Sequence, residues 1–165
     1  MIEELAEMDA TPEEKAFEAF IGILQADPAL SRVVKTWATW DGDPADAEPP
    51  ASDATPWIRI TPDGGAPDWL FQNGWAAVLN APMRIKVELC IADISAAARM
   101  RFWHLVRAAA LAPDPAQRQA NKAVLEVVGV NNVANTKGGY GIDQATDQGL
   151  VISIAGFELS LQVDA

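Results

Sequence analysis

The side chains that most often act in catalysis are scarce in this chain, which has one histidine, His104, and one cysteine, Cys90. A cysteine nucleophile needs a histidine base within hydrogen-bonding reach. Cys90 shortly precedes the segment that contains His104, so the two side chains could meet. A surface histidine and a cysteine packed as a small hydrophobe are the commoner arrangement for such isolated residues. We therefore expect that the protein is not an enzyme and has no catalytic residues.

Metal and phosphate motifs are also lacking. The acidic side chains between Asp41 and Glu48 could bind calcium, but their spacing is not that of an EF-hand loop. The segment Lys137-Gly138-Gly139-Tyr140-Gly141 matches neither phosphate-binding glycine pattern. A single cysteine allows no internal disulfide and no cysteine-based zinc site. No metal and no cofactor are expected.

Basic and aromatic side chains supply candidates for an interface instead. Arg59, Arg84 and Lys86 would share one exposed sheet face as a positive stripe, unless they form cross-strand pairs with Glu88 or Glu158. The chain has six tryptophans, several near segment ends, where they suit either core filling or an interface. Trp103 is expected at the edge of the core. The interface candidates are Trp40, Asp41, Asp43, Trp57, Arg59, Arg84, Lys86, Glu88, Lys137, Tyr140, Glu158 and Gln162.

The formal net charge of −11 limits the partners. Binding to nucleic acid needs clustered Lys and Arg, so direct sequence-specific binding is not expected. An anionic membrane surface is disfavoured for the same reason. The acidic first residues do not resemble a signal peptide, and no apolar run is long enough to span a bilayer. We expect synthesis in the cytosol and no membrane partner.

Two helices are predicted around these candidates. Thr11, Pro12 and Glu14 form a capping signature, and the Asp27-Pro28 pair ends the helix. A short helical turn is allowed over 29–35. Ser95 is the expected cap of a second helix over 96–111. The apolar stripes of the two helices are Phe17, Phe20, Ile21 and Leu24, and Ala98, Phe102, Leu105, Val106 and Ala109.

Three strands are predicted, over 57–61, 83–92 and 150–163. The alternation of apolar and polar residues at 83–92 is typical of an antiparallel sheet with one wet face. In the last strand the alternation slips by one residue at Gly156, which predicts a β-bulge there. Residues 69–79 could be irregular or a strand, and residues 116–128 could be a helix or a strand.

The predicted architecture is one α+β domain over 1–165. Its mainly antiparallel sheet carries both amphipathic helices on one face, and the other face is open to water or to a partner. The acidic, proline-rich residues 41–56 are expected to form a flexible loop, and the Gly/Asn-rich residues 129–149 a second loop.

This order of elements, with the residue patterns within them, resembles the tail terminator and neck proteins that join head and tail in long-tailed bacteriophages. The resemblance rests on the capped helix with Phe17, Phe20 and Ile21, the Asp27-Pro28 break, the strand Trp57-Ile58-Arg59-Ile60, the strand Arg84-Ile85-Lys86-Val87-Glu88-Leu89, which leads through Asp93 and Ser95 into the second helix, and the closing Gly156-Phe157-Glu158-Leu159-Ser160-Leu161.

What the resemblance implies is a virion structural protein, made in the host cytoplasm, that acts at the tail–head junction. Such a subunit forms a ring, usually of six copies, on the end of the tail tube. Its partners would be other copies of itself and the tail tube protein, with the sheath and head connector proteins as further candidates. The alternatives are a head-completion or connector protein, or a small cytosolic binding module or enzyme with a cleft near Trp69, Trp75 and His104.

Overall fold

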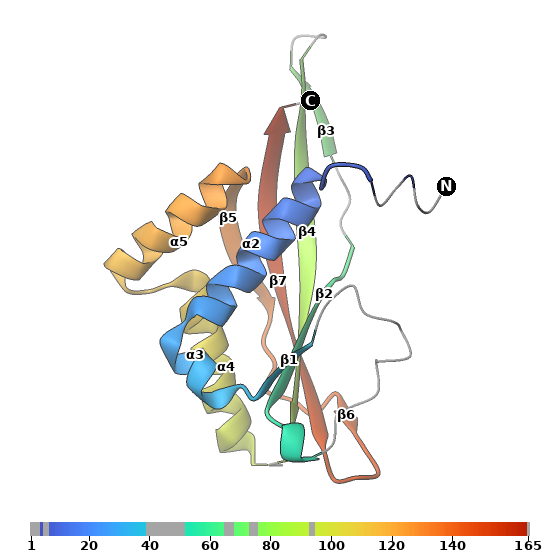
Figure 1. Ribbon diagram of the computed structural model, residues 1–165, viewed down its shortest axis with the longest axis vertical. Helices are drawn as coiled ribbons and strands as arrows, with labels where there is room; N and C mark the ends of the chain where they lie inside the picture. The colour runs from blue at the N-terminus through green and yellow to red at the C-terminus, as the bar shows by residue number, and fades with distance from the viewer. Residues whose placement is uncertain are drawn as a thin grey trace.

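The computed structural model describes residues 4, 7–38, 52–64, 68–72, 76–92 and 95–164. A layer of helices covers one face of a long, twisted sheet (Figure 1). The α+β prediction is therefore confirmed. Of the predicted loop at 41–56, residues 41–51 lie outside the described residues, and the short 3-10 helix Ser52–Ala54 follows them.

The first helix, α2 (Pro12–Ala26), begins where the sequence predicts. The Thr11 hydroxyl accepts a hydrogen bond from the Glu14 amide at 3.2 Å, and the Glu14 carboxylate accepts one from the Thr11 amide at 2.5 Å. Asp27 then caps a short helix, α3 (Pro28–Val33), by accepting a bond from the Leu30 amide at 2.8 Å. These paired caps supply partners to amides that a helix cannot satisfy internally.

Two further helices come later in the chain. Helix α4 (Ala96–Leu111) begins after Ser95, as predicted. Residues 116–128, which the sequence left open, belong mostly to helix α5 (Pro115–Val127). Asp114 caps α5, and the buried Asn121 side chain donates to the carbonyl oxygen of Ala109 at 2.9 Å. This bond ties α5 to the end of α4.

Two long antiparallel strands form the centre of the sheet, β4 (Ala76–Ile91) and β7 (Val151–Asp164). The outer edge of β4 pairs with β2 (Trp57–Pro62) and, further along, with β3 (Asp68–Gln72). The outer edge of β7 pairs likewise with β5 (Val130–Lys137) and then β6 (Gln144–Ala145). Strand β1 (Thr36–Ala38) adds one parallel pairing, with β2. The sheet is thus mainly antiparallel, as predicted.

The prediction of a loop over 129–149 is wrong, because β5 and β6 lie within it. The Gly, Asn and Asp content suggested turns, but pairing with β7 satisfies the backbone hydrogen-bonding groups of β5 and β6. The Asn135 side chain strengthens the pairing by donating to the carbonyl oxygen of Gly156 at 2.8 Å. The ambiguous residues 69–79 contribute to β3 and to the start of β4, which begins earlier than predicted.

The β-bulge predicted at Gly156 is also misplaced. The pairing of β7 with β4 runs without interruption through Gly156, which lies opposite Lys86. The extra residue is Thr136 in β5, between the partners of Phe157 and Gly156. The alternation of apolar residues in β7 changes because this strand contributes side chains to two apolar clusters. Its odd-numbered residues face the helices, whereas Ile152 and Ile154 face a smaller cluster on the opposite side of the sheet.

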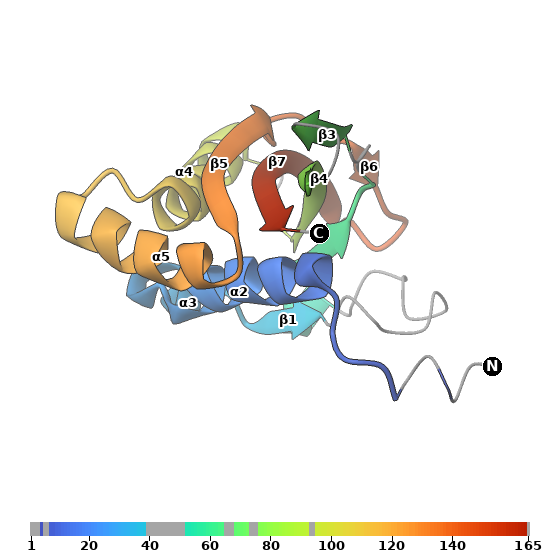
Figure 2. The ribbon, with the colours of Figure 1, turned by 90° about the horizontal axis from the view of Figure 1, so that it is seen from above.

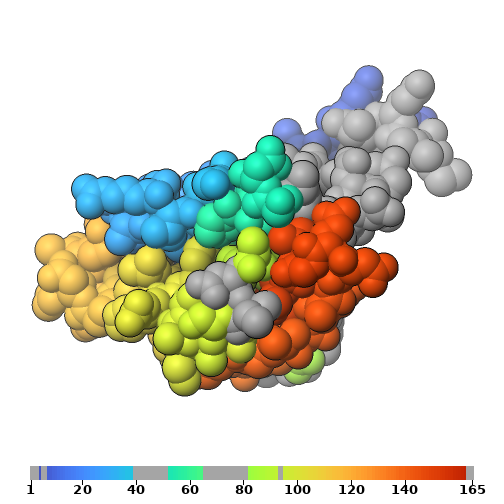
Figure 3. Space-filling model, turned by 90° about the horizontal axis from the view of Figure 1, so that it is seen from below, coloured from blue at the N-terminus to red at the C-terminus, as the bar shows by residue number. Residues whose placement is uncertain are grey.

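The larger core lies between the sheet and the helices, and α3 and α5 join α2 and α4 in enclosing it (Figure 2). The expected layer of two helices is therefore larger than predicted. Figure 3 shows the molecule from below. This end of the molecule is formed by α3 together with the start of α4, the segment around Ser52–Ala54 and the residues leading into β7. The largest fully buried side chains are Trp103, Phe17, Phe20 and Phe157.

Candidate functional site

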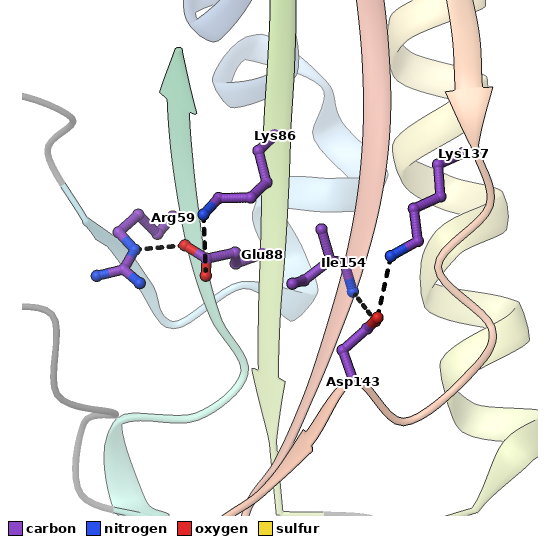
Figure 4. Close-up of polar contacts among 6 residues, drawn as sticks. All are labelled: Arg59, Lys86, Glu88, Lys137, Asp143 and Ile154. Carbon is purple, nitrogen blue, oxygen red and sulfur yellow. Dashed lines mark hydrogen bonds and ion pairs between the residues drawn. The ribbon is translucent and has the colours of Figure 1, made fainter. Parts of the chain in front are cut away.

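The sheet face opposite the helices carries a row of charged side chains from neighbouring strands. We call it the polar sheet face and define it by Arg59, Arg84, Lys86, Glu88 and Glu158. Because Arg59 of β2 and Glu88 of β4 are direct partners in the register, their side chains meet. The Arg59 Nε atom lies 2.5 Å from Glu88 Oε2, and Lys86 Nζ lies 3.7 Å from Glu88 Oε1 (Figure 4).

Burial differs strongly along this face. The side chains of Arg59 and Glu88 are only 19% and 9% exposed, and the Arg59 guanidinium lies 5.1 Å from the centre of the Trp57 ring. Arg84 is 68% exposed and lies 3.8 Å from Glu158. An exposed pair of this kind contributes about 0.2–1 kcal/mol. The predicted positive stripe is thus neutralised by ion pairs. Arg59 and Arg84 pair across strands with Glu88 and Glu158, which is the alternative that the sequence left open, and Lys86 pairs with Glu88 within β4.

A further ion pair joins the end of β5 to the segment that follows it, and a hydrogen bond fastens that segment to β7. Lys137 Nζ lies 3.0 Å from Asp143 Oδ1, and Asp143 Oδ2 accepts a hydrogen bond from the Ile154 amide at 2.7 Å (Figure 4). Lys137, predicted as an interface residue, therefore has a partner within its own chain. Gln162 is exposed near the end of β7.

Trp57 and Cys90 lie in the smaller cluster on the same side of the sheet, with Leu150 and Ile152. Cys90 is fully buried. His104 is exposed on α4, which covers the opposite side of the sheet. The sheet therefore separates the two residues, and the cysteine–histidine pair considered from the sequence is not formed.

The thiol of Cys90 should react slowly in the folded protein. Burial raises the pKa of Cys90, so less thiolate is present at pH 8, and the reagent also lacks access. We expect modification by a thiol-specific aromatic disulfide to be at least about a hundredfold slower in buffer than in denaturant, because the strand must open first. Equal rates in the two conditions would contradict this burial.

The glycine-rich segment covers helix α4. A side chain at Gly139 would collide with the indole of Trp103, with a Cβ atom only 2.6 Å from Cζ2. The neighbouring Tyr140 ring lies 5.0 Å from the Arg107 guanidinium, and its carbonyl oxygen accepts a bond from Arg99 Nε at 3.2 Å. Glycine at 139 is therefore explained by close packing on Trp103. Tyr140 packs against α4 through Arg99 and Arg107, and it lies away from the polar sheet face.

A shallow hollow that includes His104 lies on the outer side of α4. Basic, apolar and aromatic side chains line it: Met100, Arg101, His104, Leu105, Arg107 and Tyr140. Of the other residues named from the sequence, Trp40, Asp41, Asp43 and Trp75 lie outside the described residues, and Trp69 is placed only as part of β3.

Two features are absent from the ranges that the structure describes. No group of three or more His, Cys, Asp or Glu side chains there could hold a metal ion. No helix in those ranges is long and apolar enough to cross a membrane. The acidic residues between Asp41 and Glu48, considered for calcium, fall outside them.

Comparison with known proteins found a similarity in structure. No family model matches the chain, and no curated protein sequence matches it. A chain from a solved structure described as "Virion of native gene transfer agent (GTA) particle" is similar over 88% of this chain and 93% of its own length, with 14% sequence identity and a TM-score of 0.37. A likeness at this level supports no conclusion about function.

Proposed function

We propose that this chain is a structural subunit of a phage-like virion, which forms a ring on the end of the tail tube and joins it to the head connector. The proposal rests on the polar sheet face, which no helix of the described chain covers. The outer edges of β1 and β5 also lack a second strand partner within the described residues. Open strand edges are liabilities that neighbouring subunits remove, and the exposed charges of Arg84 and Glu158 are available to such a neighbour.

The composition supports the same assignment. A net charge of −11 suits a ring through which DNA passes without binding, because like charges keep the polymer from adhering to the wall. The partners would then be further copies of the chain, the tail tube protein, and the sheath and head connector proteins. No catalytic role, metal or cofactor belongs to this proposal.

A second candidate function is a small binding module. The hollow around His104 favours it, because it brings Arg101, Arg107 and Tyr140 together with the apolar Met100 and Leu105. This candidate predicts a monomer that binds a ligand on α4, whereas the ring predicts self-association. A head-completion or connector protein would also assemble with other virion proteins, and only its position in the particle would differ.

The test is the state of the purified protein and its place in the particle. We expect light scattering to give a multiple of the 17.7 kDa chain mass, and negative-stain images to show rings, alone or on tail ends. Deletion of the gene in a particle-producing strain should leave tails of irregular length that do not join heads. A chain that stays monomeric with and without tails, together with normal particles after deletion, would refute the proposal.

A further inference from the structure

The hollow on α4 lies in the most basic part of an acidic protein. Residues 96–127 contain five Arg and Lys side chains and two acidic ones, although the whole chain has 23 acidic and 12 basic residues. The hollow itself contains Arg101, Arg107 and His104, without an acidic residue. Arg101 is exposed and makes no hydrogen bond or ion pair with any described residue. This surface is suited to an acidic partner.

The hollow is also partly apolar. Met100 is 53% exposed, although it projects from a helix whose neighbouring residues Phe102 and Trp103 are buried. Leu105 and Tyr140 contribute further apolar surface to the lining. A matching partner would therefore present an apolar side chain flanked by carboxylates, because the apolar group gains from burial and the flanking charges set the orientation.

The chain carries such a segment just before α2. Met8 is 66% exposed, more than Met100 at 53%, and its neighbours Glu7 and Asp9 are exposed acids. None of the three forms an ion pair or side-chain hydrogen bond within the described residues. The sequence Glu7-Met8-Asp9 thus complements the hollow in both charge and apolar character.

One subunit does not bring these two surfaces together. The segment leading into α2 and helix α4 lie on opposite sides of the molecule in two perpendicular views (Figures 1 and 2). We propose that residues 7–9 of one copy dock into the α4 hollow of the next copy, with Met8 against Met100 and Tyr140 and with the carboxylates toward Arg101 and Arg107. A contact between different surfaces of identical chains is heterologous and can close into a ring. The inference therefore rests on the proposed ring and names one of its contacts.

Single cysteines placed on the two surfaces provide the main test. Met8→Cys and Met100→Cys proteins should form a disulfide-linked dimer when mixed under mild oxidation, in at least about tenfold greater yield than either protein alone. The wild type, whose one cysteine is buried, is the control. A protein with both substitutions should give a ladder of linked species that stops at the ring size.

Charge reversal gives an independent readout. Asp9→Lys and Arg101→Glu should each weaken self-association by about tenfold, and the combined variant should recover most of the loss. Arg32→Glu, at an exposed arginine of α3, is the matched control and should have little effect. The wild-type association should also weaken as the salt concentration rises.

The outcomes separate this contact from the ring itself. Rings that form without enrichment of the mixed dimer would overturn the docking proposal and leave the ring intact, with the hollow free for another protein. Linkage within a monomeric double variant would also overturn it, since the segment would then occupy its own hollow. Absence of both rings and linked dimers would overturn the proposed function together with the contact.

Discussion

Replacement of Trp103 by alanine should destabilise the protein by about 3–5 kcal/mol, the usual cost of removing a large aromatic side chain from a core. Trp103 is 1% exposed, and its ring meets that of Phe102 edge-on with centroids 6.1 Å apart. The cavity would lie between α4 and the segment at Gly139, which cannot collapse without moving β5 and β7. Denaturant unfolding monitored by far-ultraviolet circular dichroism would measure the loss.

Two comparisons make this test specific. Val127→Ala, at a helical side chain that is 86% exposed, should change stability by no more than about 0.5 kcal/mol. Trp103→Phe should cost less than half as much as Trp103→Ala, because the buried indole Nε1 has no hydrogen-bond partner among the described residues and none is lost. A loss below about 1 kcal/mol for Trp103→Ala would contradict its place in the core.

The contact with Gly139 can be isolated by a double-mutant cycle. Gly139→Ala in the wild type should cost about 1–3 kcal/mol, because the added methyl group meets the Trp103 indole. In the Trp103→Phe background the smaller ring leaves room, so the same change should cost less. A coupling energy above about 0.5 kcal/mol would show that the two residues act on each other directly.

Replacement of Arg59 by methionine should destabilise the folded chain by about 1–3 kcal/mol, since it leaves a buried carboxylate short of a partner. The Glu88 side chain is 9% exposed, and among the described residues its one remaining ion-pair partner would be Lys86, at 3.7 Å. The Arg59 side chain also packs over Trp57, so methionine retains part of the apolar contact and mainly tests the charge. Chemical unfolding at pH 7 would measure the change.

Arg84→Met is the matched control, because it removes an arginine from the same face but breaks only an exposed pair. Its expected cost is below about 0.5 kcal/mol. The double variant Arg59→Met/Glu88→Met should recover much of the stability lost in Arg59→Met, because an apolar pair can replace a buried ion pair. Similar losses for Arg59→Met and Arg84→Met would contradict the difference in burial.

The two sides of the sheet would contribute differently to the proposed assembly. The helical side is closed by side chains of one subunit, with Trp103 and Phe157 fully buried. The polar sheet face instead offers a rigid row of paired charges, in which Arg84 and Glu158 retain the greater exposure. A neighbouring subunit that contacts this face would therefore meet an arrangement that is already ordered, and ordering would cost little on binding.

The sequence by itself determined the elements whose signals are local. Thr11 and Ser95 mark helix starts because a short polar side chain next to the first turn satisfies amides there, independently of the rest of the fold. The central part of β4 was readable because Ile85, Val87 and Leu89 alternate with charged residues. From these elements the α+β class and the helical layer on one sheet face followed.

Tertiary structure alone decided what depends on contacts between distant residues. The Gly/Asn-rich segment lacks a strand pattern, yet it forms β5 and β6 because the exposed edge of β7 supplies its hydrogen-bond partners. The change of phase near Gly156 suggested a bulge, whereas β7 passes straight through and serves two clusters on opposite faces. The periodicity of a strand shows where its apolar side chains fall. It does not show whether one or both faces of the strand pack against an apolar cluster.

The interface candidates show the same division. The strand pattern identified Arg59, Arg84 and Lys86 as one stripe, with Glu88 and Glu158 as possible partners. Only the register of β2, β4 and β7 decided that the ion pairs form. The hollow on α4 had His104 as its only signal in the sequence, because its lining joins one helix to Tyr140 from a distant segment. Charge and shape at a surface depend on which strands and helices become neighbours, and long-range packing sets that arrangement.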